Sequence, residues 1–137
     1  MAELRRRYSI EEANALLEQI RPLAQELVER RRALAQARSA RRRIASQIAG
    51  NGGGIDPRAA VELDERVAEE LKGLARCVNA IHGLGALVKD PDEGLVDFPA
   101  LRGDEHVYFC WRLGEDEIEY WHGVDEGFAG RKPLPLE

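Results

Sequence analysis

The sequence predicts a mainly α-helical fold: a long, coiled-coil-like antiparallel helical hairpin that carries a small C-terminal antiparallel β-hairpin. Three observations predict it. Over most of the first 88 residues, apolar side chains recur at spacings of three and four, the period of a helix with one buried face. A glycine-rich segment near residue 50 divides this pattern into two arms. Beyond the arms, five of the eight aromatic residues lie between Tyr108 and Trp121, among residues that favour strands.

The first helical arm is expected over residues 10–50. Ser9 and Glu12 have the spacing of a capping box, in which each side chain accepts a hydrogen bond from a backbone amide at the helix start. Apolar residues then follow the a/d spacing of a coiled coil. Pro22 lacks an amide hydrogen and clashes with the preceding turn, so it predicts a kink or a break. The glycines of residues 50–54 end the arm.

The second helical arm is expected over residues 56–88. Asp56 provides a side-chain cap, and Pro57 suits the first helical position, where a backbone amide would have no partner. Three glycines within this range each lower helix propensity by about 1 kcal/mol relative to Ala. They indicate either close contacts between helices or an early end of the helix around Gly83. These glycines are Gly73, Gly83 and Gly85.

The charge distribution predicts assembly. Residues 1–50 carry 11 Arg and 6 Glu, a net +5, whereas residues 51–137 carry 9 basic and 19 acidic groups, a net −10. At about 1.5 Å per residue, two arms this long would leave much apolar surface in water. We therefore expect a homodimer in which two hairpins form a four-helix bundle, with basic arms beside acidic ones. Nucleic acid is the less favoured partner, because the chain is acidic overall, at −5.

The C-terminal part of this single domain, residues 95–137, is expected to form the β-hairpin and a tail. Residues 107–113 and 118–122 are rich in aromatic and branched side chains and form the two strands, and residues 114–117 form the turn. Two strands alone are marginally stable in water, so the hairpin is expected to dock on the root of the helical arms.

Several segments of the sequence resemble the uncharacterised bacterial family known as domain of unknown function 2203. The resemblance covers nearly the whole chain and is most specific in the C-terminal part, but it implies no known reaction. The segments are Ile10-Glu11-Glu12-Ala13-Asn14, Val88-Lys89-Asp90, Gly94-Leu95-Val96-Asp97-Phe98-Pro99, Cys110-Trp111-Arg112-Leu113-Gly114-Glu115, Tyr120-Trp121-His122 and Gly127-Phe128-Ala129-Gly130-Arg131.

Five residues of the C-terminal part are candidate ligands for a metal, with zinc or iron as the ions considered, or for a small molecule. Thiolate, imidazole and carboxylate groups are the usual ligands of these metals, although the spacing here is not diagnostic. The more frequent role of such residues is structural, because free cysteine is among the most buried residue types. The candidates are Asp97, Cys110, Glu115, His122 and Glu126.

The register of the β-hairpin decides whether Cys110 and His122 can meet. One register places Arg112 opposite Glu119 and Cys110 opposite Trp121, which puts Cys110 and His122 on opposite faces. The other places Cys110 opposite His122. We favour the first register for its Arg–Glu pair.

Two further groups of residues are candidate contact sites. Aromatic side chains and Arg131 could form a recognition surface on the hairpin; its residues are Trp111, Tyr120, Trp121 and Arg131. Asp97 lies between two apolar residues, so we expect it to be drawn partly inside with Arg131 or Lys89 as its partner. Arg41, Arg42 and Arg43 are candidate anion contacts, but consecutive residues point in different directions around a helix and no aromatic residues alternate with them.

The sequence favours a non-enzymatic, dimeric helical interaction module with an aromatic-lined C-terminal recognition surface. A metal- or small-ligand-binding enzyme with a Cys/His/carboxylate site is the alternative, and an RNA-binding helical arm is a weaker one. Two cysteines cannot form a disulfide framework, and neither a leader nor a run of about 20 apolar residues is present, so we expect a cytoplasmic protein without a membrane span.

Overall fold

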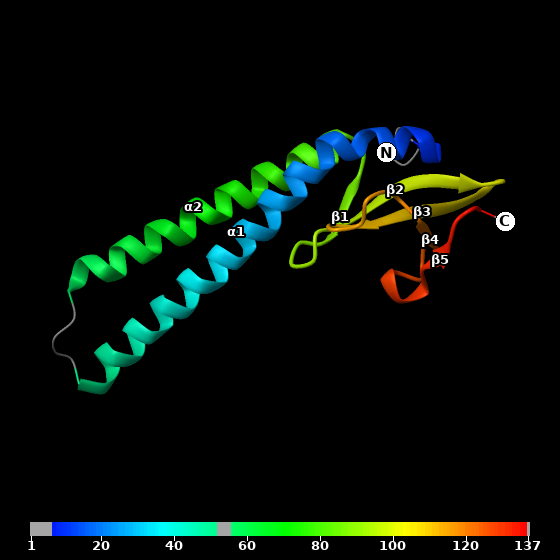
Figure 1. Ribbon diagram of the computed structural model, residues 1–137. Coiled ribbons are helices and arrows are strands. Elements are labelled where there is room, and N and C mark those ends of the chain that lie inside the picture. Colours follow the sequence, from blue (N-terminus) through cyan, green and yellow to red (C-terminus); the bar gives the residue numbers. More distant parts are fainter. Residues whose placement is uncertain (1–6, 52–55, 137) are drawn as a thin grey trace.

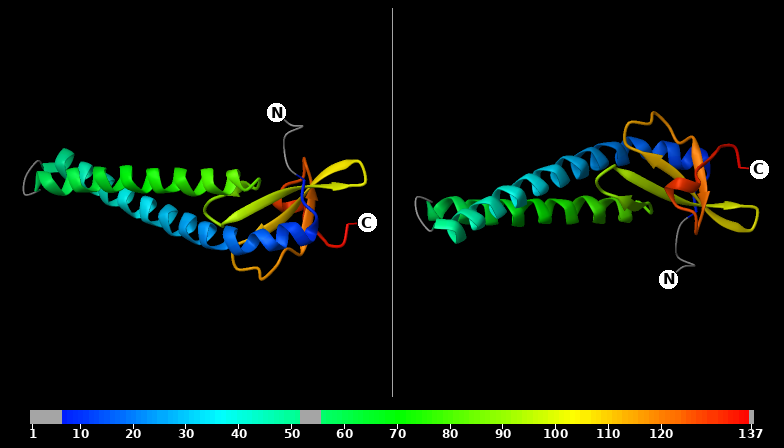
Figure 2. Two further views of the ribbon diagram at one scale, coloured as in Figure 1. Left: turned by 90° about the horizontal axis from the view of Figure 1, so that it is seen from above. Right: turned by 90° about the horizontal axis from the view of Figure 1, so that it is seen from below.

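The computed structural model describes residues 7–51 and 56–136, which form a two-helix arm joined to a β-sheet (Figure 1). Helix α1 (Ile10–Asn51) and helix α2 (Pro57–Gly83) lie side by side and antiparallel, as the hairpin prediction requires. The sheet lies at the end of the arm far from the point where α1 ends and α2 begins (Figure 2). Among the described residues, neither helix is long and apolar enough to cross a membrane.

Helix α1 begins as the sequence predicts. The Glu12 carboxylate accepts a hydrogen bond from the Ser9 amide at 2.9 Å, and the Ser9 hydroxyl accepts one from the Glu12 amide at 3.1 Å, so the capping box is confirmed. The helix continues through Pro22 without a break. In Figure 1 its axis changes direction between the part above the sheet and the part beside α2.

Helix α2 also begins as predicted but ends earlier than residue 88. The Asp56 carboxylate accepts a hydrogen bond from the Arg58 amide at 2.9 Å, with Pro57 in the first turn. The helix ends at Gly83, the alternative that its glycines left open, and Gly85 follows at φ +94°. Leu87 and Val88, which were expected in the helix, belong to the first strand instead.

The two arms are held together by close packing and by ion pairs. A Cβ atom at Gly73 would collide with the Arg30 guanidinium, which confirms Gly73 as a close helix contact. Arg30 also pairs with Glu70 at 3.2 Å. Farther along, Arg41 pairs with Asp64 at 2.9 Å. Part of the charge complementarity seen in the sequence is therefore used between the two arms of one chain.

The sheet is larger than the small β-hairpin expected. It contains five antiparallel strands that pair in chain order, namely β1 (Leu87–Asp90), β2 (Leu95–Arg102), β3 (Glu105–Arg112), β4 (Tyr120–Gly123) and β5 (Lys132–Pro133). The sheet was underestimated for a physical reason. The two apolar residues of β1 also fit the end of the helical pattern, and the short extended piece expected at residues 95–99 is part of the longer, mostly buried strand β2.

The core lies between the N-terminal part of α1 and one face of the sheet. Because side chains alternate along a strand, every second residue of β2, β3 and β4 points at α1. These residues are Val96, Phe98, Ala100, Val107, Phe109, Trp111 and Trp121. The short 3₁₀ helix η2 (Phe128–Gly130) lies on the other side of the sheet from α1 (Figure 1). The residues between these core positions point toward that side.

Candidate metal centre

Strand pairing brings three of the predicted ligand residues together on the sheet face that points away from α1. Asp97 on β2 lies directly opposite Cys110 on β3. On the other side of β3, Cys110 lies opposite Tyr120 and Tyr108 lies opposite His122. His122 is therefore the diagonal neighbour of Cys110 on the same face, and the three residues come from three adjacent strands.

The favoured register of the β3–β4 pair was wrong, and so was the alternative. The observed register is shifted by one residue from the favoured one, which changes the face on which His122 lies. It differs by two residues from the alternative, so the alternative had the right face and the wrong partner. Arg112 does not face Glu119. Its guanidinium pairs with Glu93 at 3.8 Å, and its backbone amide donates to the Glu115 carboxylate at 2.8 Å.

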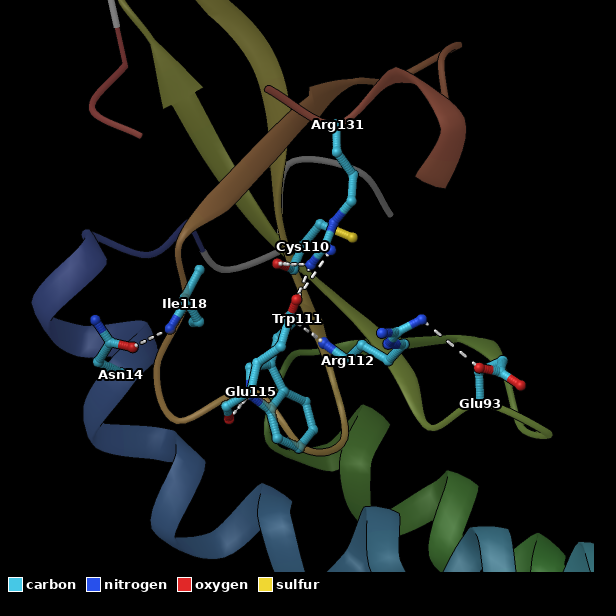
Figure 3. A network of polar contacts seen from close by, with 8 residues as sticks. All are labelled: Asn14, Glu93, Cys110, Trp111, Arg112, Glu115, Ile118 and Arg131. Carbon is cyan, nitrogen blue, oxygen red and sulfur yellow. Dashed lines mark hydrogen bonds and ion pairs between the residues drawn. The ribbon is translucent and has the colours of Figure 1, made fainter. Parts of the chain in front are cut away.

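The segment between β3 and β4 explains the error, because it is not the tight turn that was assumed. Its backbone leaves the hairpin and contacts both α1 and the sheet. The Asn14 side chain of α1 accepts a hydrogen bond from the Ile118 amide at 2.8 Å, and the Glu115 carbonyl accepts one from the Trp111 indole at 2.9 Å (Figure 3). The contact with Asn14 joins residues that are distant in the sequence.

The three side chains form a compact, buried cluster. One potential ligand atom of Asp97, of Cys110 and of His122 lies within 4.8 Å of each of the others. Asp97 is 1% exposed, His122 3% and Cys110 0%. The Nε2 atom of His122 lies 2.9 Å from Oδ2 of Asp97, and its Nδ1 atom lies 2.7 Å from the Gly123 carbonyl oxygen.

The surroundings of His122 favour the charged imidazolium. The hydrogen bond to Asp97 raises the pKa of His122 to about 10, with further contributions from Cys110 and the Gly123 carbonyl that outweigh the effect of burial. Both ring nitrogens then donate, one to the carboxylate and one to the carbonyl. The pair is neutral overall, and the second oxygen of Asp97, Oδ1, has no hydrogen-bond partner among the described residues.

Glu115 lies apart from the cluster and is held by Arg131. Both Nη atoms of Arg131 donate to the Glu115 carboxylate, at 2.8 and 2.9 Å, and Nη2 also donates to the Cys110 carbonyl at 3.1 Å (Figure 3). The prediction that Arg131 or Lys89 pairs with Asp97 was therefore wrong. Its partner is His122, and Lys89 instead lies 5.1 Å from the centre of the Tyr108 ring.

Glu126 is also outside the cluster. Its carboxylate accepts a hydrogen bond from the Gly123 amide at 2.7 Å and pairs with Lys132 on β5. It thus holds the turn that follows β4, next to the backbone carbonyl that His122 contacts. Of the five candidate ligands, the structure brings together three.

The proposed recognition residues divide between the two faces of the sheet. Trp111 and Trp121 are buried against α1, at 0% and 6% exposure, and line no surface. Tyr120 and Arg131 are partly accessible on the opposite face, where the Arg131 guanidinium lies 4.1 Å from the centre of the Tyr120 ring. The alternation of side chains along β3 and β4 accounts for this division.

The arginines of the first arm do not act as one group. Arg41 pairs with Asp64, and Arg43 donates to the Ser39 hydroxyl at 3.4 Å. Arg42 lines a groove of about 290 Å³ on another face of α1. The other residues of this groove are Arg31, Leu34, Ala35, Arg38 and Asp92. The spacing of Arg31, Arg38 and Arg42 at three to four residues or its multiples could have indicated this groove.

Comparison with known proteins gives one match. The model of the family described as an uncharacterized conserved protein (DUF2203) matches residues 6–134 of this chain. No curated protein and no solved structure matches it.

Proposed function

This chain belongs to the DUF2203 family of uncharacterized conserved proteins, and from that premise we propose that it is a metal-binding helical module. Asp97, Cys110 and His122 bind one first-row transition metal ion, for which Zn²⁺ is the best fit. The ion links β2, β3 and β4 on the sheet face that points away from α1.

The observation that carries this proposal is the distance between the three ligand atoms. Zn²⁺ is bound at about 2.3 Å by sulfur and at about 2.0–2.2 Å by nitrogen and oxygen, so two ligands of a tetrahedral ion lie about 3.2–3.7 Å apart. The potential ligand atoms here already lie within 4.8 Å of one another. Small side-chain rotations are therefore sufficient to close the site around an ion.

The second contact of His122 supports the same assignment. Histidine ligands usually donate their other ring N–H to a carbonyl or a carboxylate, which fixes the ring and leaves the first nitrogen for the metal. The Gly123 carbonyl, 2.7 Å from Nδ1, is in that position, and Nε2 faces Asp97. An ion between them would take the place of the proton on Nε2.

Burial favours a structural role over a catalytic one. Three protein ligands leave the fourth position of a tetrahedral ion to water, but a catalytic ion also needs access for a substrate. Here the three residues are at most 3% exposed, and Arg131 of the tail donates a hydrogen bond to the Cys110 carbonyl. The alternative is that Asp97 and His122 form a buried ion pair and bind no metal. A metal titration distinguishes these two possibilities.

The test is titration of purified, tag-free protein with Zn²⁺ after chelation. We expect one ion per chain, with binding lost in Cys110→Ser and in His122→Ala. Cys77→Ser is the matched control, because Cys77 is the other buried cysteine and lies on α2, away from the cluster. The proposal fails if the folded wild-type protein binds no stoichiometric metal, or if Cys110→Ser binds it as tightly as Cys77→Ser does.

We also propose that the module is a homodimer that pairs through its arms. Val61 and Leu71 on α2 are 54% and 43% exposed, and Ile48 on α1 is 50% exposed. With Ala68 and Ala75, the α2 residues recur at spacings of three, four and seven, which makes an apolar stripe along the helix. A second copy of the chain is the occupant that would bury such a stripe in a four-helix bundle.

A further inference from the structure

The side chain of Arg131 has a buried donor that none of its hydrogen bonds uses. Its two Nη atoms are occupied by the Glu115 carboxylate and the Cys110 carbonyl. Its Nε atom is buried and has no hydrogen-bond partner among the described residues. A buried N–H without a partner costs free energy of folding, so the groups around it indicate which acceptor it is placed to contact.

The group next to this nitrogen is the Cys110 side chain. In Figure 3 the sulfur of Cys110 lies beside the nitrogen-bearing end of Arg131. The Nη2 atom of Arg131 donates to the Cys110 carbonyl at 3.1 Å, so the guanidinium lies against this residue. The unused Nε–H is thus next to the Cys110 side chain.

Four contacts fix the guanidinium in this position. Besides its hydrogen bonds to Glu115 and to the Cys110 carbonyl, it lies between two aromatic rings, 4.1 Å from the centre of Tyr120 and 4.6 Å from the centre of Phe128. Arginine favours such sites, because its planar group stacks on rings while its edge donates hydrogen bonds. The Nε–H direction is therefore set before any ion arrives.

We propose that Arg131 is a positioning residue of the metal centre, whose Nε–H donates a hydrogen bond to the Cys110 thiolate when the ion is bound. This inference rests on the proposed metal-binding function. It gives the tail after β4 a part in metal binding through Arg131. A zinc- or cobalt-bound cysteine is a thiolate, and a charged donor aimed at its sulfur orients and stabilises it. Partners of metal ligands contribute about 10- to 100-fold to metal affinity.

The test uses Co²⁺, because the charge-transfer absorption band from sulfur to cobalt reports on the sulfur itself. A hydrogen bond to sulfur lowers the energy of its lone pairs, so removal of the donor should move the band to longer wavelength. We expect Arg131→Gln to show this shift and to bind Co²⁺ about 10- to 100-fold more weakly than wild type. Arg131→Lys keeps the positive charge but lacks the Nε–H. Its band should therefore be shifted to longer wavelength, as in Arg131→Gln.

Arg102→Gln is the matched control, because Arg102 is an arginine of the same sheet that lies five residues from Asp97 along β2 and pairs with Glu105. It should leave both the band and the affinity at their wild-type values. The inference is overturned if wild type binds Co²⁺ but Arg131→Gln has an unchanged band, if Arg131→Lys restores the wild-type band, or if Arg102→Gln shifts it equally. Absence of Co²⁺ binding by wild type would instead contradict the metal site itself.

Discussion

At the scale of single residues, the Asp97–His122 pair is the most consequential feature of the protein. Both side chains are almost fully buried, and each is the other's main charged partner. Removal of one member of a buried ion pair leaves the other charge without compensation, which usually costs about 3–5 kcal/mol. The pair therefore matters for stability whether or not a metal is bound.

We predict that His122→Ala lowers the free energy of unfolding of the metal-free protein by about 3–5 kcal/mol. The Asp97→Ala, His122→Ala double variant should lose less than the sum of the two single changes, because the second change removes the charge that the first left unpaired. Urea denaturation in the presence of a chelator measures both. Additive losses would show that the two residues do not act as a pair.

The Glu115–Arg131 pair gives a dependence on pH in the acid range. Burial raises the pKa of Glu115, but hydrogen bonds from Arg131 and from the Arg112 amide outweigh it and lower that pKa in the folded protein. The stability that Glu115 contributes is therefore present above its ordinary pKa and is lost as the pH falls through the lower, folded value.

We predict that Glu115→Gln lowers the free energy of unfolding by about 2 kcal/mol near neutral pH. The difference between wild type and variant should shrink as the pH falls from about 6 toward about 2, because the wild-type carboxylate then gains a proton. Thermal or urea denaturation over this range gives the difference at each pH. A difference that stays constant or grows in acid would refute the assigned pairing.

At the scale of elements, the junction between α2 and β1 determines where the arm ends and the sheet begins. Gly85 adopts φ +94°, and a Cβ atom there would collide with the Tyr8 hydroxyl. Gly83, two residues earlier, has nothing within 4 Å of its Cβ position. The two glycines therefore differ in what they do, although the sequence does not distinguish them.

We predict that Gly85→Ala lowers the free energy of unfolding by about 1–3 kcal/mol, because left-handed backbone is strained for alanine. Gly83→Ala is the matched control. It should be neutral or stabilising by up to about 1 kcal/mol, since alanine is the better helix former. Denaturation curves of the two variants decide this, and equal effects would contradict the assignment of the junction to Gly85.

The elements also show how far sequence reasoning reaches. Both caps and the arms follow from local patterns, because capping residues and helical periods act over a few residues. Strand β1 was missed, because its two apolar residues also fit the pattern of the second arm, and β2 was expected only as a short extended piece at residues 95–99. Asp97 meets Cys110 through the β2–β3 register, and His122 joins them through the β3–β4 register, which the contact of Ile118 with Asn14 helps to set.

At the scale of the whole molecule, the helical arm is the part whose apolar surface the chain does not fully cover. Its charges are partly paired within the chain, by Arg30 with Glu70 and by Arg41 with Asp64. The exposed apolar residues of the arm have no such partner within its described part. Association of arms is therefore expected to depend on apolar contact more than on charge.

We predict that the wild-type protein is a dimer and that Leu71→Glu makes it monomeric, because a charge on the α2 stripe cannot be buried in the bundle without a large cost. Leu101→Glu is the matched control. Leu101 is 44% exposed, close to the value for Leu71, but lies on β2 rather than on the arm. Light scattering measures the mass of each, and a monomeric wild type or a dimeric Leu71→Glu would contradict the arm interface.

The metal centre is the central claim, and X-ray absorption at the zinc edge of the zinc-loaded protein tests it most directly. We predict one sulfur ligand at about 2.3 Å together with nitrogen and oxygen ligands at about 2.0–2.2 Å. The sulfur contribution should be lost in Cys110→Ser and retained in Cys77→Ser. A zinc spectrum that contains only nitrogen and oxygen ligands in the wild-type protein would contradict the account.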